Sequence, residues 1–152
     1  MDMVPGNDPA RNGTAPDPFA QYPAQDVFFE DAPVEPILEG GDPPHRRYIT
    51  ALRAAGREMP DFAGHYRVVH YGCGTMCGSA KFLDRRSGRI LDLPAGLARY
   101  SPDLMHTAAS RLLRVRDALE GAWTRCRFTD LVLEDGQFRT VAQHDGPCSE
   151  DA

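Results

Sequence analysis

The chain has 152 residues, a length that suits one domain with a hydrophobic core of its own. No apolar run approaches the roughly 18 residues that a membrane-spanning helix needs, so a transmembrane protein is excluded. The net charge of −5 argues against a protein that works by neutralising nucleic-acid phosphates, and no nucleic-acid partner is expected. These figures leave open both an enzyme and a binding protein.

Charge and proline are distributed unevenly along the chain. Residues 1–44 carry nine acidic side chains against one arginine, together with nine of the thirteen prolines. Such a segment cannot bury enough apolar surface to order itself, which predicts an acidic, flexible arm over residues 1–26. A single domain is expected over residues 27–144, and its first residues should lie along the body with their carboxylates facing arginines. Residues 145–152 are expected to form an acidic tail clipped by Cys148.

Taken in chain order, the body begins with a helix and continues in strands. Apolar residues at helical spacing over 45–56 predict a short amphipathic helix. Alternating β-branched and aromatic residues predict strands at 65–71, 79–83, 89–91, 110–115, 127–133 and 137–141. The segments 84–88 and 134–136 are typical of hairpin turns. Residues 94–109 show no clear pattern, and one helical turn is expected near 102–105.

These elements together predict an α+β fold. Because every connection between strands is short, the strands are expected to pair antiparallel. We expect one N-terminal helix packed on a mostly antiparallel sheet of about six strands, built from hairpins and stapled by disulfides.

Residues 72–78, with the sequence GCGTMCG, form a glycine-rich loop between two predicted strands. The glycines relax the backbone enough for Cys73 and Cys77 to approach disulfide geometry. A rigid loop at the end of two strands is a good position for a binding surface. The residues expected to contribute to that surface are His65, His70, Tyr71, Gly74, Thr75 and Met76.

The four cysteines allow three complete pairings. Their spacing favours Cys73 with Cys77 and Cys126 with Cys148, the second pair clipping the tail against the sheet. An even number of well-separated cysteines fits an oxidising compartment. The first residues contain neither a basic nor an apolar segment typical of a signal peptide. We therefore expect a periplasmic or secreted protein whose signal peptide has been removed.

Three motifs resemble the pattern of an uncharacterised family of small secreted bacterial proteins. They are PDFAGHY at 60–66, GCGTMC at 72–77 and DRRSG at 84–88, and the similarity extends over roughly 46–142. The resemblance implies an exported protein and leaves its activity open. One departure is that the family often has a second local cysteine pair before the closing hairpin, where this chain has Cys126 alone.

The first functional hypothesis is an exported, non-enzymatic binding protein. It would act as a periplasmic inhibitor or immunity-type protein that engages a protein partner of the cell envelope through the 72–78 loop. The small size and the lack of a recognisable catalytic or phosphate-binding motif favour it. Neither a cofactor nor a metal is expected. A zinc site made of Cys73, Cys77, Cys126 and either His65 or His70 is disfavoured, because structural zinc sites usually show two short-spaced pairs.

Two alternatives stay open. The first is a small cysteine-dependent cell-wall hydrolase or transpeptidase, with Cys73 or Cys77 as the nucleophile and His65 as the base. The second is a domain that binds an anion or another solute through surface arginines. Fifteen of the sixteen basic residues in 45–144 are arginines, and a guanidinium group binds carboxylate or phosphate with two parallel hydrogen bonds.

Overall fold

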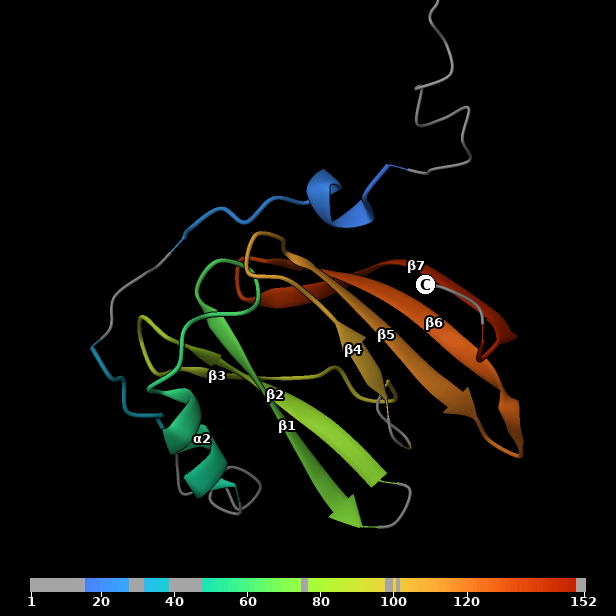
Figure 1. Ribbon diagram of the computed structural model, residues 1–152, viewed down its shortest axis with the longest axis horizontal. Helices are drawn as coiled ribbons and strands as arrows, with labels where there is room; N and C mark the ends of the chain where they lie inside the picture. The colour runs from blue at the N-terminus through green and yellow to red at the C-terminus, as the bar shows by residue number, and fades with distance from the viewer. Residues whose placement is uncertain are drawn as a thin grey trace, which may run out of the picture.

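The computed structural model describes residues 16–27, 32–38, 48–74, 77–97, 100 and 102–149; of residues 71–74 and 77–78 it describes the backbone alone. Within these residues the chain forms a short 3-10 helix, one α-helix and seven strands (Figure 1). In chain order they are η2 (Pro18–Gln21), α2 (Ile49–Ala55), β1 (Tyr66–Gly74), β2 (Cys77–Asp84), β3 (Ile90–Asp92), β4 (Asp103–Met105), β5 (Leu112–Leu119), β6 (Ala122–Glu134) and β7 (Gln137–Pro147).

The strands form two antiparallel sheets. The smaller sheet has the order β1-β2-β3 and the larger one the order β4-β5-β6-β7. Figure 1 shows α2 beside the smaller sheet and the larger sheet on the other side of it. The chain therefore builds three layers, in which the smaller sheet is covered on both faces.

This architecture corrects the predicted fold class. The sequence predicts an α+β domain with one helix on a single sheet of about six strands. The structure is instead mostly β, with two sheets of three and four strands and one α-helix of seven residues among the described residues. The strand β4 stands where a helical turn is predicted. A strand of three residues contains too few alternating positions for its period to be recognised in the sequence.

The main core lies between the two sheets. Phe62 is fully buried there, with ring centroids 5.5 Å from Phe82 and 6.1 Å from Phe138. A second cluster lies between α2 and the smaller sheet and includes Leu52 and Val69. Because consecutive residues of a strand point to opposite faces, apolar residues are needed on both faces of β1 and β2. This double requirement explains the adjacent apolar pairs in these strands: Val68 and Phe82 belong to the main core, and Val69 and Leu83 belong to the second cluster.

The described N-terminal segments lie along the body. The amide of Arg111 donates to the carbonyl of Tyr22 at 2.7 Å, and the amide of Ala24 donates to the carbonyl of Ala109 at 2.8 Å. The sequence predicts a flexible arm over 1–26; the part from residue 16 onward makes these contacts, and residues 1–15 lie outside the described residues. Hydrogen bonds to the backbone of the body hold a segment whose own composition would not order it.

Residues 32–38 cover the second cluster. The amide of Val34 donates to the carbonyl of Gly56 at 2.9 Å, and Val34 and Leu38 pack against the cluster beside α2. Glu35 accepts a hydrogen bond from Arg53 at 3.0 Å. The prediction that carboxylates of this segment face arginines of the body is confirmed at this pair.

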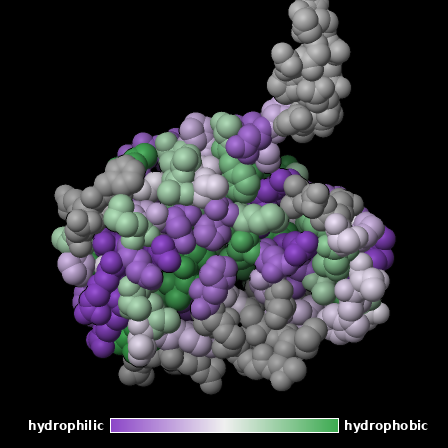
Figure 2. Space-filling view, viewed as in Figure 1, coloured by the Kyte–Doolittle hydropathy of each residue, from purple (hydrophilic) through white to green (hydrophobic). Residues whose placement is uncertain are grey.

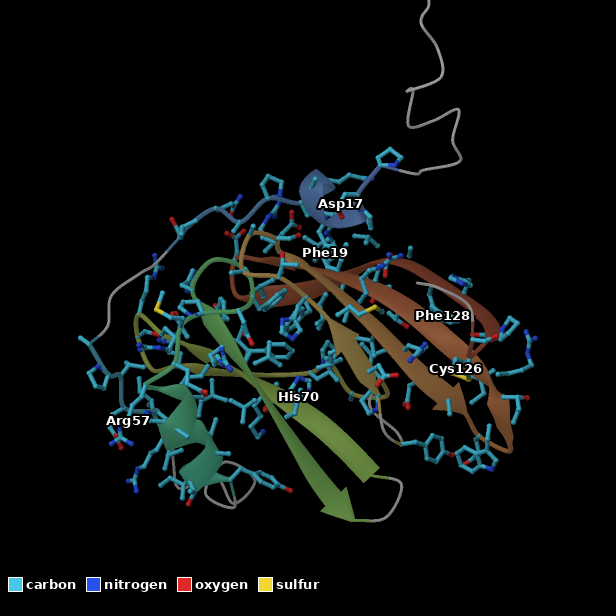
Figure 3. The ribbon with its side chains drawn as sticks, viewed as in Figure 1. Asp17, Phe19, Arg57, His70, Cys126 and Phe128 are labelled. Atoms are coloured by element: carbon cyan, nitrogen blue, oxygen red, sulfur yellow. A yellow bond between two sulfur atoms is a disulfide. The ribbon has the colours of Figure 1, made fainter. Side chains whose placement is uncertain are left out.

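A disulfide joins Cys126 to Cys148 and links β6 to the residue that follows β7 (Figure 3). This pairing is the predicted one, and its Cα atoms are 4.8 Å apart. The side chains of Cys73 and Cys77, the other predicted pair, lie outside the described residues. Among the helices that the structure describes, none is long and apolar enough to cross a membrane.

Candidate functional site

A cavity of about 300 Å³ opens where the N-terminal segment, the turn between β2 and β3, and the β6–β7 turn meet. We call it the pocket. Its wall is mostly polar and is formed by Gln25, Asp26, Ala63, His65, Tyr66, Asp84, Arg86, Arg89, Arg111, Leu133, Asp135 and Gly136. A second cavity, of about 60 Å³, lies beside β5 and β6 and includes Leu97 and Thr129.

A buried histidine–aspartate pair forms one wall of the pocket. Nδ1 of His65 donates to Oδ1 of Asp84 at 2.8 Å, and the two side chains are only 12% and 11% exposed. Tyr66 pairs with Asp84 in the β1–β2 ladder, which explains why His65 and Asp84 meet. Two of the sequence motifs, PDFAGHY and DRRSG, therefore supply the two halves of one interaction.

Asp84 is held by more than His65. Its carboxylate also accepts the amide of Arg86 at 2.9 Å and the hydroxyl of Ser87 at 3.0 Å. Burial alone would raise the pKa of the Asp84 carboxyl, but the hydrogen bonds from His65, Arg86 and Ser87 hold that pKa below its usual range. The carboxylate is thus ionised and keeps the His65 ring in one orientation.

The backbone beside His65 brings the N-terminal segment to the pocket. Ala63 and Gly64 both have left-handed backbone angles, with φ of 53° and 86°. A Cβ atom on Gly64 would lie 2.1 Å from the carbonyl oxygen of Asp26. Only glycine permits this approach, so the glycine of the PDFAGHY motif allows Gln25 and Asp26 to form part of the wall.

Tyr66 provides a neutral hydroxyl next to the charged groups. Its side chain lies in the wall and is mostly buried. Burial, followed by the nearby Asp84 carboxylate, raises the pKa of the Tyr66 hydroxyl, although Arg86 and Arg89 oppose that change. The hydroxyl therefore stays protonated and able to donate a hydrogen bond at neutral pH.

Three arginines stand around the pocket. The guanidinium group of Arg86 is 3.6 Å from the carboxylate of Asp26, and both side chains are largely exposed. Arg111 donates to the carbonyl of Pro23 at 3.0 Å and also pairs with Glu134. No hydrogen bond or ion pair joins the guanidinium of Arg89 to any residue that the structure describes. Arg89 is therefore the wall arginine whose charge no described side chain or carbonyl pairs with.

The structure separates His65 from the predicted loop. Cys73 lies eight positions further along β1, which corresponds to roughly 26 Å of extended strand. Cys77 pairs with Gly74 at that same far end. The backbone thus does not bring His65 to Cys73 or Cys77, the pairing that the cysteine-enzyme hypothesis requires.

The remaining predicted site residues lie away from the pocket or outside the described side chains. The ring of His70 stacks on that of His106 with centroids 6.2 Å apart, and burial, followed by the charge of His106, lowers the pKa of His70. Two predicted contacts, Thr75 and Met76, lie wholly outside the described residues, and of Tyr71 and Gly74 only the backbone is described.

Metal binding finds no support in the described part of the chain. No group of three or more histidine, cysteine, aspartate or glutamate side chains there is placed to hold a metal ion. Cys126, one of the zinc ligands considered from the sequence, is bonded to Cys148.

Sequence reasoning missed most of the pocket. Of its wall, only His65 belongs to the predicted site residues. The turn that contains Arg86 is predictable, but its arginines carry no mark that separates them from other surface arginines. Asp26 and Arg111 are far apart in the chain, and only the folded path of the N-terminal segment places both in one wall.

No known protein family, curated protein or solved structure shows a significant match to the chain. The resemblance to a family of small secreted proteins therefore stays a prediction.

Proposed function

We propose that the protein is an exported binding protein that holds a small anionic solute in the pocket beside His65. The observation that carries this proposal is the convergence of Arg86, Arg89 and Arg111 on one cavity. Guanidinium groups recognise carboxylates and phosphates with a planar pair of donors. The carboxylate of Asp26 already lies 3.6 Å from Arg86, which supports a carboxylate as a chemically suitable occupant.

The other polar groups of the wall fit the same role. The Tyr66 hydroxyl adds a neutral donor. Since Nδ1 of His65 donates to Asp84, Nε2 of the neutral ring is a hydrogen-bond acceptor and can only meet a donor group of a ligand. On the face in Figure 2, hydrophilic side chains are interspersed among the hydrophobic ones over the described residues. This distribution favours a polar ligand over a broad apolar interface on that face.

Export is part of the proposal. The Cys126–Cys148 disulfide supports an oxidising compartment, because disulfides rarely persist in the cytosol. The inhibitor or immunity-type interpretation depends on residues 72–78, which the sequence predicts as a loop. The backbone of 72–74 and 77–78 belongs instead to the paired ends of β1 and β2, and the side chains of these residues lie outside the described ones. The inhibitor interpretation stays a prediction, and the pocket favours the solute-binding alternative.

The test is an NMR titration of the full chain with propionate and, separately, inorganic phosphate. We expect saturable shifts of the amides of Ala63, Gly64 and Gly136, which lie in or beside the wall. Arg89→Gln should weaken binding about tenfold, because a hydrogen bond to a charged group is worth about 1.5 to 3 kcal/mol.

Arg57→Gln is the matched control. Arg57 is an exposed arginine just after α2 that does not line the pocket (Figure 3). Equal loss of affinity in both variants would indicate a general charge effect. Equal loss, or the absence of saturable shifts up to concentrations on the order of 10 mM, would contradict the proposal.

A further inference from the structure

The arginines around the pocket differ in whether they form ion pairs within the protein. Arg86 pairs with Asp26, and Arg111 pairs with Glu134. Arg89, which stands just before β3, is the one wall arginine without such a partner among the described residues. The smaller sheet therefore contributes to the pocket one positive charge that has no ion-pair partner among the described residues.

The negative groups show the same division. Asp84 is occupied by His65 and by the turn that follows it, and Asp26 faces Arg86. Asp135, in the β6–β7 turn, has no hydrogen bond or ion pair to its carboxylate among the residues that the structure describes. The larger sheet therefore contributes to the pocket one negative charge that has no ion-pair partner among the described residues.

We propose that the ligand is a zwitterion of amino-acid size, with its carboxylate at Arg89 and its ammonium group at Asp135. This inference rests on the proposed function and specifies the class of solute. An anion alone would leave the Asp135 carboxylate facing another negative charge. A ligand with both charges satisfies a wall to which the two sheets contribute opposite charges.

The dimensions of the pocket agree with a small ligand. Its volume of about 300 Å³ is at the lower end of the range for ligand cavities. Ala63 and Leu133 are its buried apolar residues and offer contact to a short side chain only. The hydroxyl of Tyr66 adds a donor for the carboxylate of the ligand.

Three related probes separate the two charges. L-Alanine carries both, propionate lacks the ammonium group and ethylamine lacks the carboxylate. In NMR titrations of the full chain we expect alanine to bind about tenfold more tightly than propionate and ethylamine to bind most weakly.

Asp135→Asn is the decisive variant. Asp135 and Gly136 both have positive φ, and Asn-Gly is as suitable as Asp-Gly in such a hairpin turn, so the fold should be retained. The variant should bind alanine no better than propionate and leave propionate binding at least as strong. Glu58→Gln, which removes an exposed carboxylate outside the pocket, should change neither affinity.

The outcomes distinguish the two proposals. Equal affinity for alanine and propionate, or tight alanine binding that survives in Asp135→Asn, would overturn the zwitterion while anion binding stands. If none of the three probes produces saturable shifts at the pocket but inorganic phosphate does, the zwitterion proposal fails and anion binding stands. If inorganic phosphate fails as well, both proposals fail.

Discussion

The two ends of the larger sheet are held by different means. At one end the Cys126–Cys148 disulfide joins β6 to the residue after β7. At the other end, Arg111 and Ser110 bind the carbonyl of Tyr22 through hydrogen bonds, and the pocket lies beside them. The end with the candidate site thus depends on hydrogen bonds and charges, which can exchange partners, whereas the opposite end is fixed covalently.

The largest effect is expected from opening the covalent end. Replacing Cys126 and Cys148 together by serine should lower the free energy of unfolding by about 3 kcal/mol, because a cross-link over 22 residues restricts the unfolded chain. Denaturant unfolding followed by circular dichroism measures this change. The amide shifts of Ala63 and Gly64 should stay as in the wild type; altered shifts there would mean that the two ends are not independent.

A smaller loss is expected at the pocket end. Gly64→Ala should cost about 2 kcal/mol, because φ is 86° and the added Cβ would meet the carbonyl of Asp26. Gly96→Ala is the matched control, since Gly96 has φ of 87° and open space around the position of a Cβ.

The difference between the two glycine variants isolates the contact with the N-terminal segment. Amide hydrogen exchange at Arg111, which donates to Tyr22, should speed up in Gly64→Ala and not in Gly96→Ala. Equal behaviour of the two variants would show that backbone strain alone explains the loss.

Lowering the pH should destabilise the pocket end of the larger sheet before the end that is closed by the disulfide. The folded state lowers the pKa of the Asp84 carboxyl, so its contribution is complete above the unfolded value of about 3.9. That contribution is lost as the pH falls from the pKa of the unfolded state through the lower pKa of Asp84 in the folded state. Asp84→Asn should cost about 1 kcal/mol at pH 7 and flatten the decline of stability below about pH 4. Unfolding curves at several pH values measure both the loss at pH 7 and the decline of stability in acid. If that decline is as steep in Asp84→Asn as in the wild type, the Asp84 carboxylate does not cause it.

The smallest effect on stability is expected from Asp26→Asn. The ion pair with Arg86 is largely exposed, and exposed pairs contribute less than about 1 kcal/mol. Removing the carboxylate should nevertheless strengthen binding of propionate, because Arg86 no longer has a competing partner. Reduced affinity for propionate would mean that Asp26 supports the ligand instead of competing with it.

Local patterns in the sequence predict most of the individual elements. The alternating residues of β1 and β6 and the turn at 134–136 are confirmed, since each is decided by neighbours within a few positions. The division into two sheets is not predictable in this way. It depends on where the chain leaves β3 and enters β4, two strands of three residues each.

Only one residue of the candidate site could be predicted from the sequence. His65 stands out because of its motif, although its partner is Asp84 and not a cysteine. Arg111 and Asp26 reach the pocket only through hydrogen bonds that span 88 positions, such as that from Ser110 to Tyr22. No local pattern records such a contact.

The long span of the Ser110–Tyr22 hydrogen bond also bears on the order of folding. Closing a loop of this length is slow compared with forming the hairpins β1–β2 and β6–β7, whose residues are neighbours in the chain. The N-terminal segment is synthesised first, yet it can dock only after the start of β5 has formed. The wall that contains Asp26 is therefore completed last, and a chain that has folded its hairpins still lacks a finished pocket.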